Sequence, residues 1–453
     1  MSPGTKSLLT TSPSRATSGA LFLALLGALT MLPPLATDVA LPGLPAIAHA
    51  LRASNAMMQW SLSVFVLAFG AGQVILGPLS ESHGRRPLLL IGLALFTIAG
   101  LGCTFSTNAE TLIALRFVQG FGACAGTVCA RAIVQDMARE DRGQAASTQG
   151  YLAAIGSLAP VVAPLLGAAI LATLNWRWLY GILPIIGIAL LILVATRIPE
   201  TSPCVAQEFI AAYRHVLHLR STLPMAGVTF GSFGAYFALI AGSPFVLVSQ
   251  LHISSTLFAV AFALNASAAL LGATVTGRLA KRLPAERIFV FGIAIMALAG
   301  CGVIVVDAML PLSPIGFTAT MMLFAFAFGI VTPSAFTAAL LDAGVSAGLV
   351  AGVLGAAQMC GGAFISALAS ALPMPSSAAT ATAVLAGTLI VIGSYGYERR
   401  SSRSSNSKEV RDHLKKRKFT YANKRERVND TALAHYESAC YRESDRFRHN
   451  PEG

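Results

Sequence analysis

Charged residues are scarce in this sequence, at 11% of 453 residues, whereas soluble globular proteins carry roughly 25%. Lysine is rarer still, since before position 400 it occurs only at Lys6 and Lys281. So few charges could not give a single folded core a solvated surface, which excludes an ordinary soluble enzyme. The 55% of hydrophobic residues, together with 41 Gly and 22 Pro, instead predict an all-α polytopic membrane protein.

Motifs for metal, nucleotide or covalent chemistry are also lacking. The seven cysteines contain no C-x-x-C pair, and most of them lie in apolar runs, so no disulfide framework or metal site is indicated. H-E-x-x-H and a phosphate-binding Gly-rich loop with Lys are absent. We therefore expect no enzyme, no cofactor and no direct use of ATP. A sensor is disfavoured too, because no soluble domain is evident.

Apolar runs of the length that crosses a bilayer, about 20 residues, repeat almost from end to end. Charged or Pro/Gly-rich breaks separate twelve of them, at 18–44, 57–79, 88–105, 110–133, 146–172, 178–196, 223–249, 257–277, 288–306, 314–340, 345–371 and 377–397. The first run is too long for the apolar part of a signal peptide, and eleven more follow it. The sequence therefore predicts twelve transmembrane helices.

The Lys and Arg residues of the loops fall on one side of this pattern. With the N-terminus inside, the outer loops hold only Arg52 and Arg177, and the other loop cations are internal. The positive-inside rule then predicts that both termini are cytoplasmic.

One hydrophilic segment divides the twelve helices into six and six. The segment after the second helix, Gly77-Pro78-Leu79-Ser80, is weakly similar to the segment after the eighth, Gly277-Arg278-Leu279-Ala280, which supports a duplication. We expect two six-helix bundles related by an axis along the membrane normal. The predicted parts are a cytoplasmic N-terminus 1–17, an N-terminal bundle 18–196, a central cytoplasmic loop 197–222, a C-terminal bundle 223–398 and a tail 399–453.

The tail accounts for much of the net charge of +12. From Arg399 onward it holds 15 Lys/Arg against 8 Asp/Glu, with Lys415-Lys416-Arg417-Lys418 as its densest block. Its apolar residues are too few to form a core, so we expect it to be disordered or loosely lipid-bound and dispensable for transport. Nucleic acid is not an expected partner, because no basic-aromatic module accompanies the charge.

Away from the helix ends, the charged residues inside the expected spans are Asp38, Arg116 and Arg131. Intramembrane charges are costly and usually functional. Asp38 lies six residues before the outer end of the first span and Arg116 six residues after the outer start of the fourth, so both lie about 9 Å deep at 1.5 Å per residue. We expect both side chains to face the same cavity at the same depth in the membrane.

A carboxylate in such a place can carry a proton, because burial disfavours its ionised form and a neighbouring cation favours it. The alternative for Asp38 is a structural one, in which it caps backbone broken by Pro33, Pro34, Pro42 and Pro45. For Arg116 the alternative is a tie between helices.

Three motifs resemble those of the major facilitator superfamily. Residues 77–87, GPLSESHGRRP, resemble its signature between helices 2 and 3, with Glu81 in place of the usual Asp. Residues 115–120, LRFVQG, resemble its helix 4 motif, whose Arg is linked to proton coupling and here is Arg116. Residues 159–167, APVVAPLLG, resemble the helix 5 motif of antiporters.

Two further segments are similar to one branch of that superfamily. Residues 37–45, TDVALPGLP, resemble the helix 1 signature of twelve-helix drug/proton antiporters. With residues 130–136, ARAIVQD, they resemble the bicyclomycin/chloramphenicol-resistance group. The resemblance implies a proton-driven exporter of small amphipathic drugs, monomeric, in a bacterial inner membrane, with the proton gradient as its energy source. A metabolite transporter of the same fold, for a sugar, amino acid or organic acid, stays open as the alternative.

The resemblance also implies roles for residues near the inner face. A gating cluster would hold Arg85 and Arg131 within reach of Asp136, with Glu81 at a helix N-terminus of the other half. Its expected members are Gly77, Glu81, Gly84, Arg85, Arg131 and Asp136. The alternative is that Arg85 and Arg86 only anchor the topology.

Two sets of residues complete the expected site. Gly156, Pro160, Pro164 and Gly167 would let the fifth helix bend and approach its neighbours, as a rocking interface or as ordinary kinked packing. A central pocket of mixed character, or else plain packing, is expected from Phe65, Phe69, Tyr236, Phe237, Asn265 and Gln358.

Overall fold

The computed structural model describes residues 20–137, 142–201, 209–309, 313–341 and 347–425. Within these ranges the chain is helical and holds no β-strand, which confirms the all-α prediction. The chain divides into two compact units, Met1–Tyr395 and Gly396–Gly453. The first unit contains every residue of the candidate site.

Twelve helices in the described part are long and apolar enough to cross a membrane, which confirms the expected number. The first six are α1 (Ala20–Asp38), α3 (Asn55–His83), α4 (Arg85–Thr104), α5 (Ala109–Met137), α6 (Arg142–Thr173) and α7 (Arg177–Arg197). The second six are α9 (Thr222–Pro244), α10 (Ser255–Leu279), α11 (Ala285–Met309), α12 (Pro314–Leu341), α13 (Ala347–Ala371) and α14 (Ser376–Arg425).

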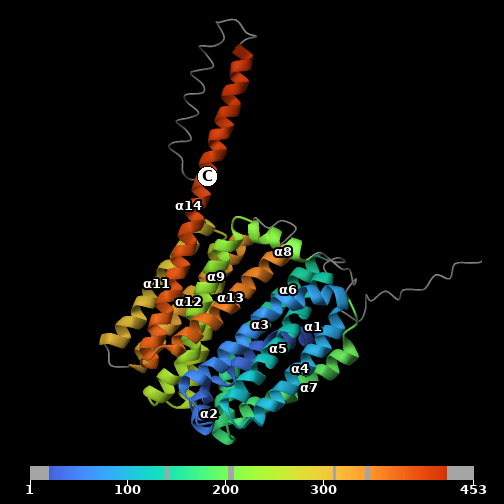
Figure 1. The fold of residues 1–453 in the computed structure, drawn as a ribbon, viewed down its shortest axis with the longest axis vertical. Helices are drawn as coiled ribbons and strands as arrows, with labels where there is room; N and C mark the ends of the chain where they lie inside the picture. The colour runs from blue at the N-terminus through green and yellow to red at the C-terminus, as the bar shows by residue number, and fades with distance from the viewer. Residues whose placement is uncertain (1–19, 138–141, 202–208, 310–312, 342–346, 426–453) are drawn as a thin grey trace, which may run out of the picture. The chain divides into compact units, whose positions relative to one another are not determined.

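The same helix pairs pack together in both halves of the first unit. In the first half α3 and α4 pack on α5, and α1 packs on α6. In the second half α10 and α11 pack on α12, and α9 packs on α13. Counted from the start of each half, these are the second with the fourth, the third with the fourth and the first with the fifth. The fold is therefore a pair of six-helix bundles with an internal repeat; in Figure 1 the helices of the first bundle run from blue to green and those of the second from yellow-green to red.

Two helix pairs join the bundles, and they too are equivalent under the repeat. The second helix of each half packs on the fifth helix of the other, as α3 on α13 and α10 on α6. Between α3 and α13 the Ser63 hydroxyl donates to Ser366 Oγ at 3.2 Å. α9 and α10 also pack on residues Leu41–Gly43, so α3, α6, α10 and α13 form the larger part, but not all, of the contact between the bundles.

The first span departs from the single helix expected at 18–44. It breaks after Asp38, continues as a short 3₁₀ turn η1 (Leu41–Gly43) and ends in α2 (Leu44–Ala50). Pro42 and Pro45 lie at the start of η1 and α2, where the missing N–H of proline leaves no helical hydrogen bond unmade. The prolines thus end one helix and begin the next, and the membrane-crossing segment runs on to Ala50. The seventh span also changes character, from α9 to a π-helical turn η2 (Phe245–Gln250).

The central loop expected at 197–222 contains a helix, α8 (Phe209–His218), while residues 202–208 lie outside the described part. From α8 the Tyr213 hydroxyl donates to the Val74 carbonyl of α3 at 3.4 Å. Burial and then the nearby Glu81 carboxylate raise the pKa of Tyr213, which keeps the hydroxyl protonated as a donor. Because α8 also packs on α9 and α13, the loop contacts both bundles.

The tail differs from the disorder expected over 399–453, because α14 continues as a helix to Arg425. A helix that is already nucleated extends at little cost. No Pro or Gly occurs between Gly396 and Pro451 to stop it. Residues 426–453 lie outside the described part, as does the expected N-terminus 1–17.

Candidate functional site

Asp38 is the last residue of α1, at the break in the first span. Its side chain is only 6% exposed, and its Oδ1 accepts a hydrogen bond from the Thr37 hydroxyl at 2.8 Å. No backbone N–H of the described residues donates to this carboxylate, so it does not cap the broken helix. Asp38 is therefore a buried acid whose hydrogen-bond partner is a neutral hydroxyl.

Arg116 is fully buried on α5 and holds the same end of α1. Its Nη1 donates to the Ala36 carbonyl at 3.1 Å and to Gln119 Oε1 at 2.8 Å. The last carbonyls of a helix have no partner within it, and Arg116 supplies one for Ala36. The guanidinium also lies 4.1 Å from the centroid of the Phe65 ring and 5.8 Å from that of Tyr180. The cation is thus fixed against two aromatic rings beside the break.

Asp38 and Arg116 are close but not paired. Arg116 contacts Ala36, two residues before Asp38, and no ion pair within 4.0 Å joins the two among the described residues. In the same described set, Nε and Nη2 of Arg116 have no hydrogen-bond partner. The guanidinium therefore keeps two donors beside the break that no described residue accepts.

Gly167 brings α6 against the backbone that follows Asp38. A Cβ at Gly167 would lie 2.1 Å from the Val39 carbonyl oxygen, closer than any real contact, whereas one at Gly156 would meet only Thr30 Oγ1 at 4.0 Å. Pro160 and Pro164 lie inside α6 between them. Since α6 also packs on α10, this helix connects the break at Asp38 with the second bundle.

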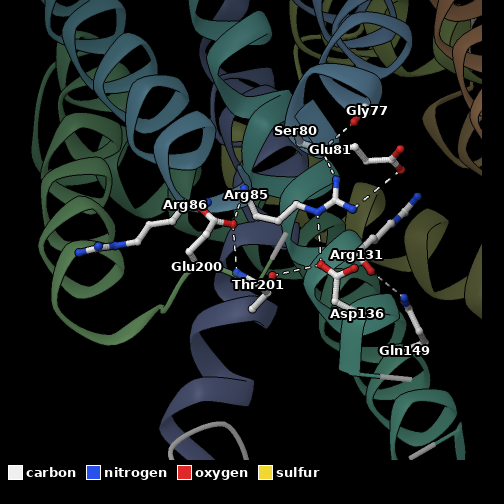
Figure 2. Close-up of polar contacts among 10 residues, drawn as sticks. All are labelled: Gly77, Ser80, Glu81, Arg85, Arg86, Arg131, Asp136, Gln149, Glu200 and Thr201. Carbon is white, nitrogen blue, oxygen red and sulfur yellow. Dashed lines mark hydrogen bonds and ion pairs between the residues drawn. The ribbon is translucent and has the colours of Figure 1, made fainter. Parts of the chain in front are cut away.

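The gating residues form a network at the junction of α3, α4 and α5 (Figure 2). Arg85 Nε lies 3.3 Å from Asp136 Oδ2, and its Nη2 lies 3.8 Å from Glu81 Oε1. Arg85 Nη1 donates to Ser80 Oγ, which in turn donates to the Gly77 carbonyl at 2.7 Å. Because Arg85 is only 6% exposed, the pair with Asp136 is largely shielded from solvent. Arg85 therefore does more than anchor the topology.

Glu200 belongs to this network although it was not among the expected residues. Its carboxylate accepts the backbone N–H groups of Arg85 at 2.8 Å and Arg86 at 3.1 Å, which are the first donors of α4. The next residue, Thr201, donates its hydroxyl to Asp136 Oδ2 at 3.1 Å. The carboxylate at a helix N-terminus is thus Glu200. The only hint in the sequence is its place just after Pro199, where the sixth helix ends.

Gly84 and Gly77 differ in what they require. Gly84 has φ +99°, which side chains rarely adopt, and a Cβ there would lie 2.6 Å from Glu200 Oε2. At Gly77 an added Cβ would meet nothing within 4 Å. Of these two positions, only residue 84 needs to be glycine in this conformation.

Arg131 is separated from the pair it was expected to share. Among the described residues it forms no ion pair with Asp136, and its carbonyl accepts from Gln149 Nε2 at 3.3 Å. Five residues along an α-helix correspond to about 140° of rotation beyond one turn, so the two side chains leave different faces of α5. In this conformation Asp136 therefore forms its ion pair with Arg85, and the expected place of Arg131 in the cluster stays a prediction.

The expected pocket residues separate into distinct groups. Phe65 lies under Arg116, and Phe69 is buried one turn further along α3. In the second bundle Asn265 Nδ2 donates to the Tyr236 hydroxyl at 3.0 Å. Phe237 stacks on Phe233 with 5.6 Å between centroids, and Gln358 is half-buried on α13.

Paired six-helix bundles around a buried carboxylate are the architecture of a membrane transporter rather than of an enzyme. Residues 26–367 match the sequence profile of the Major Facilitator Superfamily, and the chain belongs to that family.

Relatives in bacteria extend over most of the chain. It is 33% identical to an uncharacterized MFS-type transporter YdgK of Bacillus subtilis, over 76% of this chain and 87% of the relative. It is 27% identical to a bicyclomycin resistance protein homolog of Haemophilus influenzae, over 86% and 98%. It is 30% identical to the multidrug resistance protein MdtL of Escherichia fergusonii, over 74% and 84%.

The fold is similar to that of solved transporters. A D-xylose-proton symporter superposes with a TM-score of 0.63 over 83% of this chain and 97% of its own, at 15% identity. At that identity the likeness concerns the fold alone.

Proposed function

We propose that this protein is a proton-driven antiporter that exports small amphipathic drugs, such as chloramphenicol- or bicyclomycin-like compounds, across a bacterial inner membrane. The names of two relatives, a bicyclomycin resistance protein homolog and a multidrug resistance protein, support the drug cargo. The concentration of loop Lys and Arg on one side supports cytoplasmic termini. The protein acts as a monomer, with the proton gradient as its energy source.

The observation that carries this proposal is the buried Asp38 at the break of the first span. Protonated, the acid is neutral; ionised, it attracts either the free donors of Arg116 or a cationic drug. Proton and drug then compete for one cavity, and by linkage the binding of one favours release of the other.

Rocking of the bundles converts this competition into transport. The network of Arg85, Asp136 and Glu200 holds one end of the first bundle together and breaks when that end opens. Gly167 transmits the movement from the Asp38 break to α10. Phe69, Tyr236, Asn265 and Gln358 line the drug path.

The test is proton release from protein in proteoliposomes when drug is added. Asp38→Asn keeps the size of the side chain but cannot titrate, so drug-dependent proton release is lost while a neutral drug still binds. Asp38→Glu retains part of the activity. Glu110→Gln, an exposed acid in the first turn of α5, is the matched control and leaves release unchanged. Unaltered release from folded Asp38→Asn protein rules out Asp38 as the carrier.

The cargo is tested separately by growth inhibition in an efflux-deficient host. Chloramphenicol-like, bicyclomycin-like and cationic compounds form the panel, and protection against at least one class is expected. No protection, with proton-coupled uptake or export of a sugar, amino acid or organic acid, establishes the alternative cargo instead.

A further inference from the structure

The second bundle carries a polar pair in the middle of two membrane spans. Asn265 on α10 is fully buried, and Tyr236 on α9 is 7% exposed. Asn265 Nδ2 donates to the Tyr236 hydroxyl at 3.0 Å, but Asn265 Oδ1 has no hydrogen-bond partner among the described residues. Buried polar atoms are nearly always satisfied, so this amide oxygen indicates a group that the isolated chain does not provide.

The pair offers one donor and one acceptor side by side. With Asn265 Nδ2 donating to Tyr236, the Tyr236 O–H can donate outward and Asn265 Oδ1 can accept. If the amide is turned over, Tyr236 donates to the amide oxygen, and the Asn265 N–H and a Tyr236 lone pair face outward instead. Either orientation leaves one donor beside one acceptor. The complementary group is therefore a neutral amide or hydroxyl, rather than a bare cation or a carboxylate.

An aromatic wall adjoins this pair. The Phe328 ring lies 4.6 Å from the Tyr236 ring, centroid to centroid, at an interplanar angle of 20°, and Phe233 lies 5.9 Å from Phe328. Stacked rings of this kind favour a flat apolar group beside the hydrogen-bonding pair.

The two helices that carry the pair also contact the turn after the proposed proton carrier. α9 and α10 both pack on η1, the turn that follows Asp38. At the start of α10 the Ser255 hydroxyl donates to the Pro42 carbonyl of that turn at 3.4 Å. The helices that would hold a ligand therefore also contact the segment that follows Asp38.

We propose that Asn265 and Tyr236 bind the neutral amide or hydroxyl group of an exported aromatic compound, with Phe328 against its ring. This inference rests on the proposed export of drugs, and it assigns the recognition of neutral compounds to the second bundle. Lipophilic cations without hydrogen-bonding groups use Asp38 and do not need the pair.

The experiment measures equilibrium binding of two probes to purified protein. Chloramphenicol carries an amide, hydroxyls and an aromatic ring, whereas tetraphenylphosphonium is a cation without hydrogen-bonding groups. Asn265→Leu and Tyr236→Phe each weaken chloramphenicol binding about tenfold, because a site built to hydrogen-bond a ligand is left unpaired. Tetraphenylphosphonium binding stays within about twofold of wild type. The double variant weakens chloramphenicol binding by less than the product of the single effects, because the two groups act together.

Ser267→Ala is the matched control, because Ser267 lies exposed on the same helix and bonds only its own helix backbone, at Ala263 O. It leaves both affinities unchanged. Equal loss of both probes in Asn265→Leu, with a lowered unfolding temperature, means that the pair only stabilises α9 against α10 and overturns the proposal. Unchanged chloramphenicol binding in both variants overturns it too, as does a wild-type protein that binds neither probe.

The same preparations separate this inference from the export proposal. Wild-type protein that binds chloramphenicol through the pair without releasing protons supports the subsite and contradicts proton-coupled export. Normal proton release with chloramphenicol in Asn265→Leu protein contradicts the subsite and supports export.

Discussion

Glu200 reaches the start of α4 only because residue 84 carries no side chain. A Cβ at Gly84 would lie 2.6 Å from the Glu200 carboxylate that accepts the N–H groups of Arg85 and Arg86. The positive φ at Gly84 aims these donors at Glu200. At the residue scale, the proposed gate therefore combines two contacts: the backbone N–H groups at the start of α4 bind the Glu200 carboxylate, and Arg85 pairs with Asp136.

A matched pair of glycines tests this arrangement. Gly84→Ala forces a side chain into a φ and ψ that cost about 1–3 kcal/mol, and it displaces Glu200. We expect slower drug export and a lower unfolding temperature in purified protein. Gly77→Ala meets open space, and in a helix it is neutral or stabilising by about 0.5–1 kcal/mol. Normal export by folded Gly84→Ala protein would show that the carboxylate site has no part in gating.

At the scale of helices, the first span and α6 are in close contact around Asp38. The span breaks after Asp38, Arg116 holds the freed Ala36 carbonyl, and α6 presses on the Val39 carbonyl through Gly167. We therefore expect a tilt of α6 against α10 to displace the backbone next to Asp38. The break leaves buried backbone groups without partners inside a helix, and such groups can exchange partners, which those of an unbroken helix cannot.

Two glycines of α6 provide the test at this scale. Gly167→Ala places a methyl group 2.1 Å from the Val39 carbonyl, and overpacking of this kind costs about 1–3 kcal/mol. We expect drug-dependent proton release in proteoliposomes to fall at least about fivefold. Gly156→Ala, with its nearest neighbour at 4.0 Å, leaves release unchanged. Equal activities of the two variants would disprove the proposed link between α6 and Asp38.

At the scale of the whole molecule, the residues of the candidate site all lie in the unit that ends at Tyr395. Its two bundles repeat the same helix pairs and meet through α3 with α13 and α6 with α10. The twelfth candidate span, Ser376–Arg400, completes the set. Nothing in this set depends on residues after Arg400.

Truncation after Arg400 tests whether the remaining residues are needed for transport. Protein ending at Arg400 keeps all twelve candidate spans, so we expect export and growth protection close to those of the full chain. Expression and the unfolding temperature are the controls. A folded but inactive truncated protein would give the 401–453 segment a role in transport.

The sequence by itself determined the membrane class, the twelve helices, their division into six and six, and the motif residues. These follow from length and hydrophobicity, because a bilayer admits few alternatives to apolar helices of about 20 residues. Local spacing also marked Asp38 and Arg116 as unusual, since charge within a span is costly.

Only the tertiary structure decided which of these residues meet. It paired Asp136 with Arg85 and not with Arg131, and it brought Glu200 from the end of the sixth helix to the start of α4. It also joined Asn265 to Tyr236 across two helices. Such contacts depend on helix rotation and on the approach of distant segments, which membrane hydrophobicity leaves unspecified, because lipid favours every apolar face equally.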